Sequence, residues 1–196
     1  MNSILKRLAV VALAGLTLGQ THAETVTGGS NIDLMFSWEG FRIARYRSPT
    51  PDVAEGGERI DTSVLQALIR QQPRPALIDV QPVRWQDGIF LLTKPRFNLP
   101  GSLWMPNVGL GELAPDWAEY FRQGLLQASS GDRDYPLVFY CTADCWMSWN
   151  AVKRASQWGY RQVYWYAEGT DGWQEADLSL EKATPLPFQL AVGLQK

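Results

Sequence analysis

Three short runs of consecutive apolar residues interrupt an otherwise mixed chain. They are Pro75–Val80, Tyr135–Tyr140 and Gln162–Tyr166. Unbroken apolar runs of this length, bounded by turn residues, are typical of strands buried on both faces of a parallel sheet. We therefore expect each run to be a core strand.

Apolar residues recur at helical spacing in the segments around these runs. The segment 62–71 can be capped by Asp61 or Thr62 and carries its apolar residues on one face. Three further helices are expected over residues 115–127, 148–158 and 169–176. Because strands and helices alternate, the pattern predicts an α/β fold, with a central parallel sheet flanked by helices.

Less regular segments separate these elements. Residues 24–61, with two glycine pairs and two prolines, are expected to form an extended N-terminal arm. A long loop containing Trp85 and Gly88 should precede a brief strand in Asn98–Pro106. With 196 residues there is room for one ordinary domain. We place it at residues 62–180, followed by a C-terminal tail over 181–196.

The first 23 residues have a different character. Lys6 and Arg7 precede an apolar run over 8–18, and small and polar residues follow before Glu24. This order is typical of a secretory signal peptide, and the run is too short to span a bilayer comfortably. We expect an exported, periplasmic protein without a membrane span after processing. The alternative is a retained amphipathic anchor.

Removing that segment changes the charge and the available chemistry. The mature chain would keep 16 basic and 20 acidic residues, a net charge of −4, which disfavours nucleic acid and anionic membranes as partners. His22, the single histidine, would also be lost. Histidine-dependent catalysis, most zinc sites and histidine-ligated haem are therefore excluded. The chain shows no nucleotide-binding glycine loop or carboxylate metal cluster, so we expect no cofactor and no metal.

The chain has two cysteines, Cys141 and Cys145, where a predicted strand meets a predicted helix. Loop amides and the positive end of the helix can stabilise a thiolate there, so we expect a lowered pKa for Cys141. If the loop curls, the two sulfurs come within reach of a disulfide or a shared ligand. A purely structural bridge is the alternative, but one closing so small a loop would restrict the unfolded chain little.

Several landmarks from Thr62 to Ala176 resemble the rhodanese-like domains. They are LIDVQP (77–82), LPGSLWMP (99–106), VFYC (138–141), and the helix, glycine-tyrosine and terminal tryptophan positions Ser148, Ala151, Gly159, Tyr160, Val163, Gly169 and Trp173. The resemblance implies a single rhodanese-like domain with Cys141 as its nucleophile. It also implies that the strand-terminal Asp79 organises a neighbouring loop through hydrogen bonds.

Two stretches are similar to a narrower group, the exported rhodanese-like proteins associated with catabolism that depends on pyrroloquinoline quinone (PQQ) and named for a CXXCW motif. These stretches are GFRIARYRSPTP (40–51) and YCTADCWMSWNAVKRA (140–155). Here three residues, Thr142, Ala143 and Asp144, separate the cysteines. The resemblance implies a setting near a PQQ-dependent dehydrogenase or a c-type cytochrome.

The loop departs from the rhodanese pattern in its charge. Rhodanese loops usually carry an arginine that attracts thiosulfate, whereas the candidate loop has no cation. It consists of Cys141, Thr142, Ala143, Asp144, Cys145, Trp146, Met147 and Ser148, and Met147 stands where related phosphatases have their arginine. Without a guanidinium in the loop, phosphoryl or arsenate chemistry is disfavoured.

Three functions remain open. In the first, a sulfurtransferase or thiol oxidoreductase, Cys141 attacks as a thiolate and Cys145 resolves the product by forming a disulfide. Its substrate would be a protein thiol, a small thiol or a sulfane-sulfur compound, and Asp144 would repel anions. The second is Cu(I) delivery, with Met147 near the two thiolates.

The third function is a catalytically idle adaptor for a quinoprotein dehydrogenase or its cytochrome. Trp146 and Trp149 could then form an exposed contact surface, since aromatic side chains are enriched at interfaces. For both tryptophans the alternative is packing inside the protein. Arg42, Arg45 and Arg47 could dock an acidic partner, although a solvated face is the simpler interpretation of this cluster.

Overall fold

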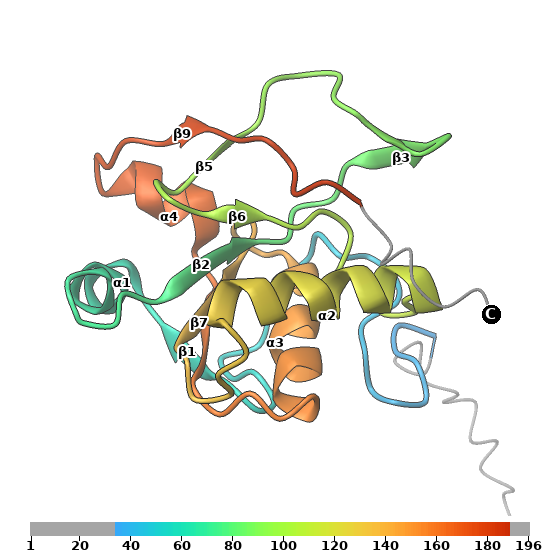
Figure 1. Ribbon diagram of the computed structural model, residues 1–196, viewed down its shortest axis with the longest axis horizontal. Coiled ribbons are helices and arrows are strands. Elements are labelled where there is room, and N and C mark those ends of the chain that lie inside the picture. Colours follow the sequence, from blue (N-terminus) through green and yellow to red (C-terminus); the bar gives the residue numbers. More distant parts are fainter. Residues whose placement is uncertain (1–33, 189–196) are drawn as a thin grey trace, which may run out of the picture. The chain divides into compact units, whose positions relative to one another are not determined.

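The computed structural model describes residues 34–188 (Figure 1). Its elements, in chain order, are β1 (Glu58–Ile60), α1 (Thr62–Ile69), β2 (Ala76–Asp79), β3 (Arg84–Gln86), β4 (Ile89–Leu91), β5 (Phe97–Asn98), β6 (Leu103–Trp104), α2 (Pro115–Ser129), β7 (Leu137–Tyr140), α3 (Trp146–Gln157), β8 (Val163–Tyr166), α4 (Gly169–Glu175) and β9 (Glu181–Lys182). The predicted signal peptide, the start of the arm and the end of the tail lie outside the described residues. No helix within residues 34–188 is long and apolar enough to cross a membrane.

A five-stranded parallel sheet forms the centre of the domain, with strand order β1-β8-β7-β2-β6. The predicted α/β fold with a central parallel sheet is thus confirmed. The three apolar runs are the adjacent strands β2, β7 and β8. The end of the arm supplies the edge strand β1, which pairs with β8.

Alternate residues of each central strand point to opposite faces of the sheet. Ile78, Phe139 and Trp165 pack with α2 and α3, whereas Leu77, Val138 and Tyr166 pack with α1 and α4. Burying a large apolar side chain contributes about 1.5–3 kcal/mol. A register slip of one residue would exchange the two sets, so packing on both faces fixes the strand ends that carry the site.

The predicted long loop around Trp85 is in fact a β-hairpin, β3–β4. Asp87 and Gly88 both have positive φ, as its tight turn requires. Trp85 packs against Phe90, Trp117 and Phe188 with ring centroids 4.6, 5.6 and 4.7 Å away. The hairpin is therefore held by aromatic packing that joins it to α2 and to the tail.

Candidate active site

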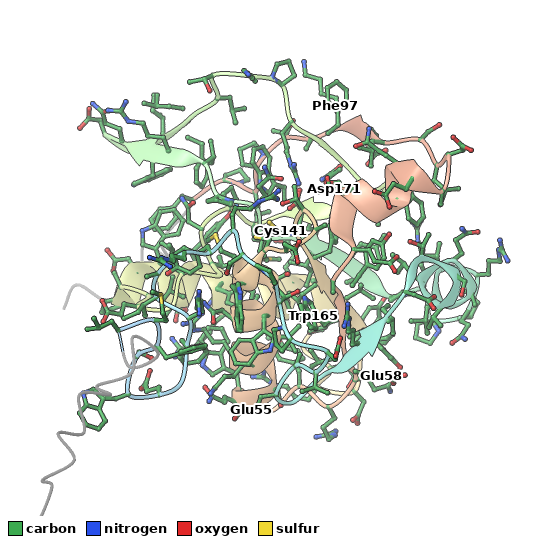
Figure 2. The ribbon with its side chains drawn as sticks, turned by 180° about the vertical axis from the view of Figure 1, so that it is seen from behind. Glu55, Glu58, Phe97, Cys141, Trp165 and Asp171 are labelled. Atoms are coloured by element: carbon green, nitrogen blue, oxygen red, sulfur yellow. The ribbon has the colours of Figure 1, made fainter. Side chains whose placement is uncertain are left out.

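The two cysteines occupy the turn from β7 into α3. Cys141 directly follows β7, and Cys145 is the N-cap residue of α3, which begins two residues earlier than expected. Figure 2 shows Cys141 between Trp165 on one side and Asp171 and Phe97 on the other. Both sulfurs are in the free form, and the two residues are only 1% and 3% exposed. The predicted position at a strand-to-helix turn is therefore confirmed.

The Cys145 thiolate is stabilised from several directions. A hydrogen bond from the Cys141 thiol is the largest of the effects that lower the pKa of Cys145. The N–H groups of Met147 and Ser148, in the first turn of α3, and the positive charge of Arg47 act in the same direction. Burial opposes them, but the pKa of Cys145 lies below that of an ordinary thiol.

Cys141 lies in a less favourable environment for negative charge. Burial raises the pKa of its thiol well above the usual value, and the interaction with Cys145 and the charge of Asp79 raise it further. Of the main-chain N–H groups, that of Thr142 lowers it. The N–H of Ala143 donates instead to Asp171 Oδ2, at 3.1 Å. The prediction that loop amides and the helix end lower the pKa of Cys141 is therefore wrong. Of the two cysteines, Cys145 is the more acidic.

The main chain leaves no room for a side chain opposite Cys141. Thr142 forms a bridge with Gly169, and the N–H of Thr170 donates to the carbonyl oxygen of Cys141 at 3.0 Å. A Cβ atom at Gly169 would lie 2.3 Å from that oxygen, and Gly169 has a φ of 58°. Glycine at the start of α4 is thus required for the loop conformation.

The arm pairs with the cysteine loop, residues 141–148. Arg47 forms an antiparallel bridge with Cys145, and the N–H of Ser48 donates to the carbonyl oxygen of Asp144 at 3.1 Å. The N–H of Trp146 donates to Tyr46 O at 2.9 Å. The Arg47 guanidinium donates to Thr142 Oγ1, which lies 3.9 Å from Cys141 Sγ. A loop without a cation of its own thus receives one from a distant segment.

Trp146 and Trp149 hold the arm and do not form the exposed contact surface considered for them. They are 9% and 8% exposed, and their indole N–H groups donate to Pro49 O at 3.1 Å and Val53 O at 3.0 Å. Arg42 lies over the Trp146 ring, 4.8 Å from its centroid. Both tryptophans therefore contribute to the site by fixing the arm on α3.

The remaining predicted loop residues have structural partners. Ser148 Oγ donates to Cys145 O at 2.9 Å and accepts from Trp165 Nε1 at 3.0 Å. Met147 is fully buried beside Gly109, where a Cβ atom would lie 2.7 Å from the Met147 Cβ. Asp144 is exposed and has a φ of 51°. Within residues 34–188 no group of three or more His, Cys, Asp or Glu side chains could hold a metal ion.

Asp79 ends the neighbouring strand β2 and is fully buried. Its carboxylate accepts from Arg96 Nε and Nη2 at 3.0 and 2.9 Å, and from the N–H of Gln81 at 2.9 Å. The predicted role of Asp79 in organising a loop by hydrogen bonds is confirmed.

A cleft of about 630 Å³ lies beside the cysteine loop at the carboxyl ends of the strands. Thr142, Thr170 and Asp171 belong to its lining, and Leu92 and Phe97 add exposed apolar surface. The cleft offers room for the non-reacting part of a bound molecule next to the loop.

Comparison with known proteins identifies the domain. The family model described as Rhodanese-like domain matches residues 61–176. The fold is similar to the polysulfide-sulfur transferase homodimer from Wolinella succinogenes, at 20% identity and a TM-score of 0.42, covering 65% of this chain and 80% of that chain. The comparison with curated proteins gives no match.

Two other solved structures are similar to parts of the chain. A full-length protein from Lactobacillus plantarum is 20% identical with a TM-score of 0.44, covering 64% of this chain and 88% of that chain. A variant of EanB in complex with hercynine is 19% identical with a TM-score of 0.48, covering 74% of this chain and 36% of that chain. At these identities the likeness is one of fold.

Proposed function

The chain belongs to the rhodanese-like domain family, and from that premise we propose that it is a two-cysteine sulfurtransferase. In this proposal Cys145 accepts a sulfane sulfur and Cys141 resolves the resulting persulfide. The observation that carries the proposal is the pair of free, buried cysteines at the turn from β7 into α3, in which one partner favours the thiolate and the other the thiol. A pair of this kind supplies both a nucleophile and a proton donor without histidine.

The first step transfers one sulfur atom. The Cys145 thiolate attacks the sulfane sulfur of a donor X–SH, whose leaving group X⁻ is a thiolate or a sulfinate. The X–S bond breaks, a bond from Cys145 Sγ to the sulfane sulfur forms, and X⁻ leaves with the electron pair. The products are the Cys145 persulfide and X⁻, so atoms and charge balance.

The second step uses Cys141. Its sulfur attacks Cys145 Sγ, the bond to the sulfane sulfur breaks, and H₂S leaves carrying the thiol proton of Cys141. The two cysteines are oxidised to a disulfide and the sulfane sulfur is reduced to sulfide. A dithiol reductant then restores both thiols by exchange.

This assignment reverses the roles expected from the sequence, where Cys141 was the attacking residue. Four groups support the reversal: the Cys141 thiol, the N–H groups of Met147 and Ser148, and the charge of Arg47 all favour a thiolate at Cys145. The N–H of Ala143, which could have served Cys141, is engaged by Asp171.

The cellular setting is a further part of the proposal. The leader pattern over residues 1–23 supports export to the periplasm, where a dithiol reductant must be supplied. A link to PQQ-dependent alcohol catabolism, through a quinoprotein dehydrogenase or c-type cytochrome, rests on the resemblance of residues 40–51 and 140–155. The arm and the cysteine loop, which carry this resemblance, are hydrogen-bonded to each other.

The test is sulfur acceptance by the mature protein. The reduced chain, Cys141→Ser and Cys145→Ser are incubated with polysulfide, and intact mass and peptide mapping locate the added sulfur. We expect Cys141→Ser to accumulate a stable Cys145 persulfide and Cys145→Ser to accumulate none. Persulfide on Cys141 in the Cys145→Ser chain, at the rate of the unaltered protein, would contradict the assignment.

The same samples separate the other two functions. A copper-delivery protein would bind one Cu(I) tightly against a competing chelator and lose it in either cysteine variant. An idle adaptor would show no sulfur uptake in any of the three chains. Either result would replace the proposed function.

A further inference from the structure

The cation that is hydrogen-bonded to the cysteine loop, Arg47, lies outside the rhodanese-like domain. The family match begins at residue 61, whereas Arg47 belongs to the arm. Among residues 34–188, Arg47 is the cationic side chain that is hydrogen-bonded to the loop. It reaches Thr142 across 95 residues of sequence.

Main-chain contacts hold Arg47 in register with the loop. The residues on either side are fixed by the 2.9 Å bond from Trp146 N to Tyr46 O and the 3.1 Å bond from Ser48 N to Asp144 O. The Tyr46 hydroxyl also accepts from the N–H of Gly111 at 3.0 Å. Because the main chain is hydrogen-bonded on both sides of Arg47, the backbone from which its side chain extends has a defined position.

Most of the hydrogen-bonding capacity of Arg47 is still available. A guanidinium has five N–H donors, and within residues 34–188 the side chain makes a single hydrogen bond, to Thr142 Oγ1, and no ion pair. Arg47 is exposed, whereas Arg154 and Arg96 are occupied by carbonyl or carboxylate partners. An anion arriving at the loop can therefore bind the free edge of Arg47.

The first covalent step at the cysteine pair releases the anion X⁻, and the second releases H₂S. The other charged groups at the loop are mostly acidic: Asp144 lies within it, Asp171 accepts from Ala143, and Asp79, which lies near Cys141, is paired with Arg96. Without Arg47, a negatively charged donor or leaving group would face Asp144, Asp171 and the Cys145 thiolate with no cation hydrogen-bonded to the loop. The adjacent guanidinium gives such a donor an attractive partner at the loop.

We propose that Arg47 is the specificity-determining residue of the cysteine pair, and that it selects small anionic sulfane-sulfur donors. The inference rests on the proposed function and adds to it an arm residue as part of the active site. The anionic end of the donor binds the guanidinium beside Thr142 while its sulfane sulfur reaches Cys145. This replaces the expectation that Asp144 makes the loop repel anions.

The test compares two alkylating probes of similar size, anionic iodoacetate and neutral iodoacetamide, on the reduced mature protein. Peptide mapping reports the rate at Cys145 for the unaltered chain, Arg47→Gln, Arg47→Lys and Arg45→Gln. Arg45 is the matched control because it is exposed, lies two residues away in the arm and carries the same charge.

We expect Arg47→Gln to lower the iodoacetate-to-iodoacetamide rate ratio about five- to tenfold, and Arg47→Lys to recover part of it. Arg45→Gln should change the ratio less than about twofold. In the unaltered chain the ratio should fall with added salt, because screening weakens the attraction. The midpoint of the rate against pH should rise in Arg47→Gln and stay constant in Arg45→Gln.

Equal ratios in the unaltered chain, Arg47→Gln and Arg45→Gln would overturn the inference. Near-ultraviolet circular dichroism confirms that each variant keeps its packing, and Arg47→Lys decides the matter if Arg47→Gln loses it. The two proposals fail separately. Sulfur uptake by Cys145→Ser rejects the sulfurtransferase assignment, whereas unchanged ratios with normal Cys145 persulfide formation reject the role of Arg47 alone.

Discussion

Two neighbouring strand ends of the central sheet each receive an arginine from a distant segment, and the arginines are used differently. At the end of β2, the buried carboxylate of Asp79 forms an ion pair with Arg96 through two hydrogen bonds, and the Arg96 side chain is 13% exposed. At the end of β7, the cysteine pair lies under an exposed Arg47 with a single side-chain bond. The paired strands bring Asp79 level with Tyr140, the residue before Cys141.

The difference separates a structural arginine from a functional one. Both charges of the Asp79–Arg96 pair are already satisfied, so this strand end contributes to folding and leaves little capacity for a ligand. Arg47 has unused donors beside an ionisable thiol, so its strand end can respond to an incoming anion. Each side of this contrast can be tested by substitution.

The largest effect on stability should come from breaking the Asp79–Arg96 ion pair. Arg96→Met would leave a buried carboxylate unpaired and lower the free energy of unfolding at pH 7 by about 3–5 kcal/mol. Burial already raises the pKa of Asp79, and loss of Arg96 would raise it further. The folded state would then bind a proton more tightly than the unfolded state, so the loss should shrink as the pH falls towards 5.

Urea unfolding of the mature chain at both pH values measures this effect. Arg47→Gln is the comparison variant and should cost less than about 1 kcal/mol because its side chain is exposed. A loss in Arg47→Gln as large as that in Arg96→Met would remove the distinction between the two strand ends.

The next effect concerns the main chain behind Cys141. Gly169→Ala forces a Cβ atom against the Cys141 carbonyl at a positive φ, and should destabilise the protein by about 2 kcal/mol or more. Gly159→Ala is the matched control, because Gly159 also has a positive φ but nothing lies within 4 Å of its added Cβ. It should cost about 1 kcal/mol. Thermal unfolding of both variants gives the comparison, and equal losses would contradict it.

A smaller effect tests the acidity order of the two thiols. Cys141→Ala removes the hydrogen bond that most lowers the pKa of Cys145, so Cys145 should keep less thiolate at pH 7. Iodoacetamide should then react about three- to tenfold more slowly. In Cys145→Ala, Cys141 should stay unreactive at neutral pH because burial raises its pKa. Fast alkylation of Cys141 in that variant would restore it as the nucleophile.

The smallest effect concerns the attachment of the arm. Trp149→Phe keeps a smaller aromatic ring but leaves Val53 O without its indole donor, which should cost about 1 kcal/mol or more. Limited proteolysis should cut the arm faster in this variant, and the iodoacetate preference should weaken as Arg47 moves away. Trp38→Phe, at a fully exposed position, should change neither result. Identical digestion of both variants would show that Trp149 does not hold the arm.

Local patterns in the sequence were enough to predict the three central strands, the four helices and the position of the cysteines. The apolar runs predicted β2, β7 and β8 because a strand buried on both faces must be apolar throughout. The β3–β4 hairpin was missed, although the Asp87–Gly88 turn signal is present in the sequence. The sequence left the burial of Trp146 and Trp149 undecided because the residues that cover them, Pro49 and Val53, lie about a hundred positions away.

By itself, the sequence determined the α/β fold, the strand-to-helix turn and the presence of two thiols in it, because hydrophobic periodicity and neighbouring residues encode these features directly. The tertiary structure alone decided which of the two thiols has the lower pKa and which cation lies beside the cysteine loop. Those properties depend on burial, on the Asp171 contact with Ala143, and on an arm that meets the loop across 95 residues. Charges and desolvation act through space, so spacing along the chain does not reveal them.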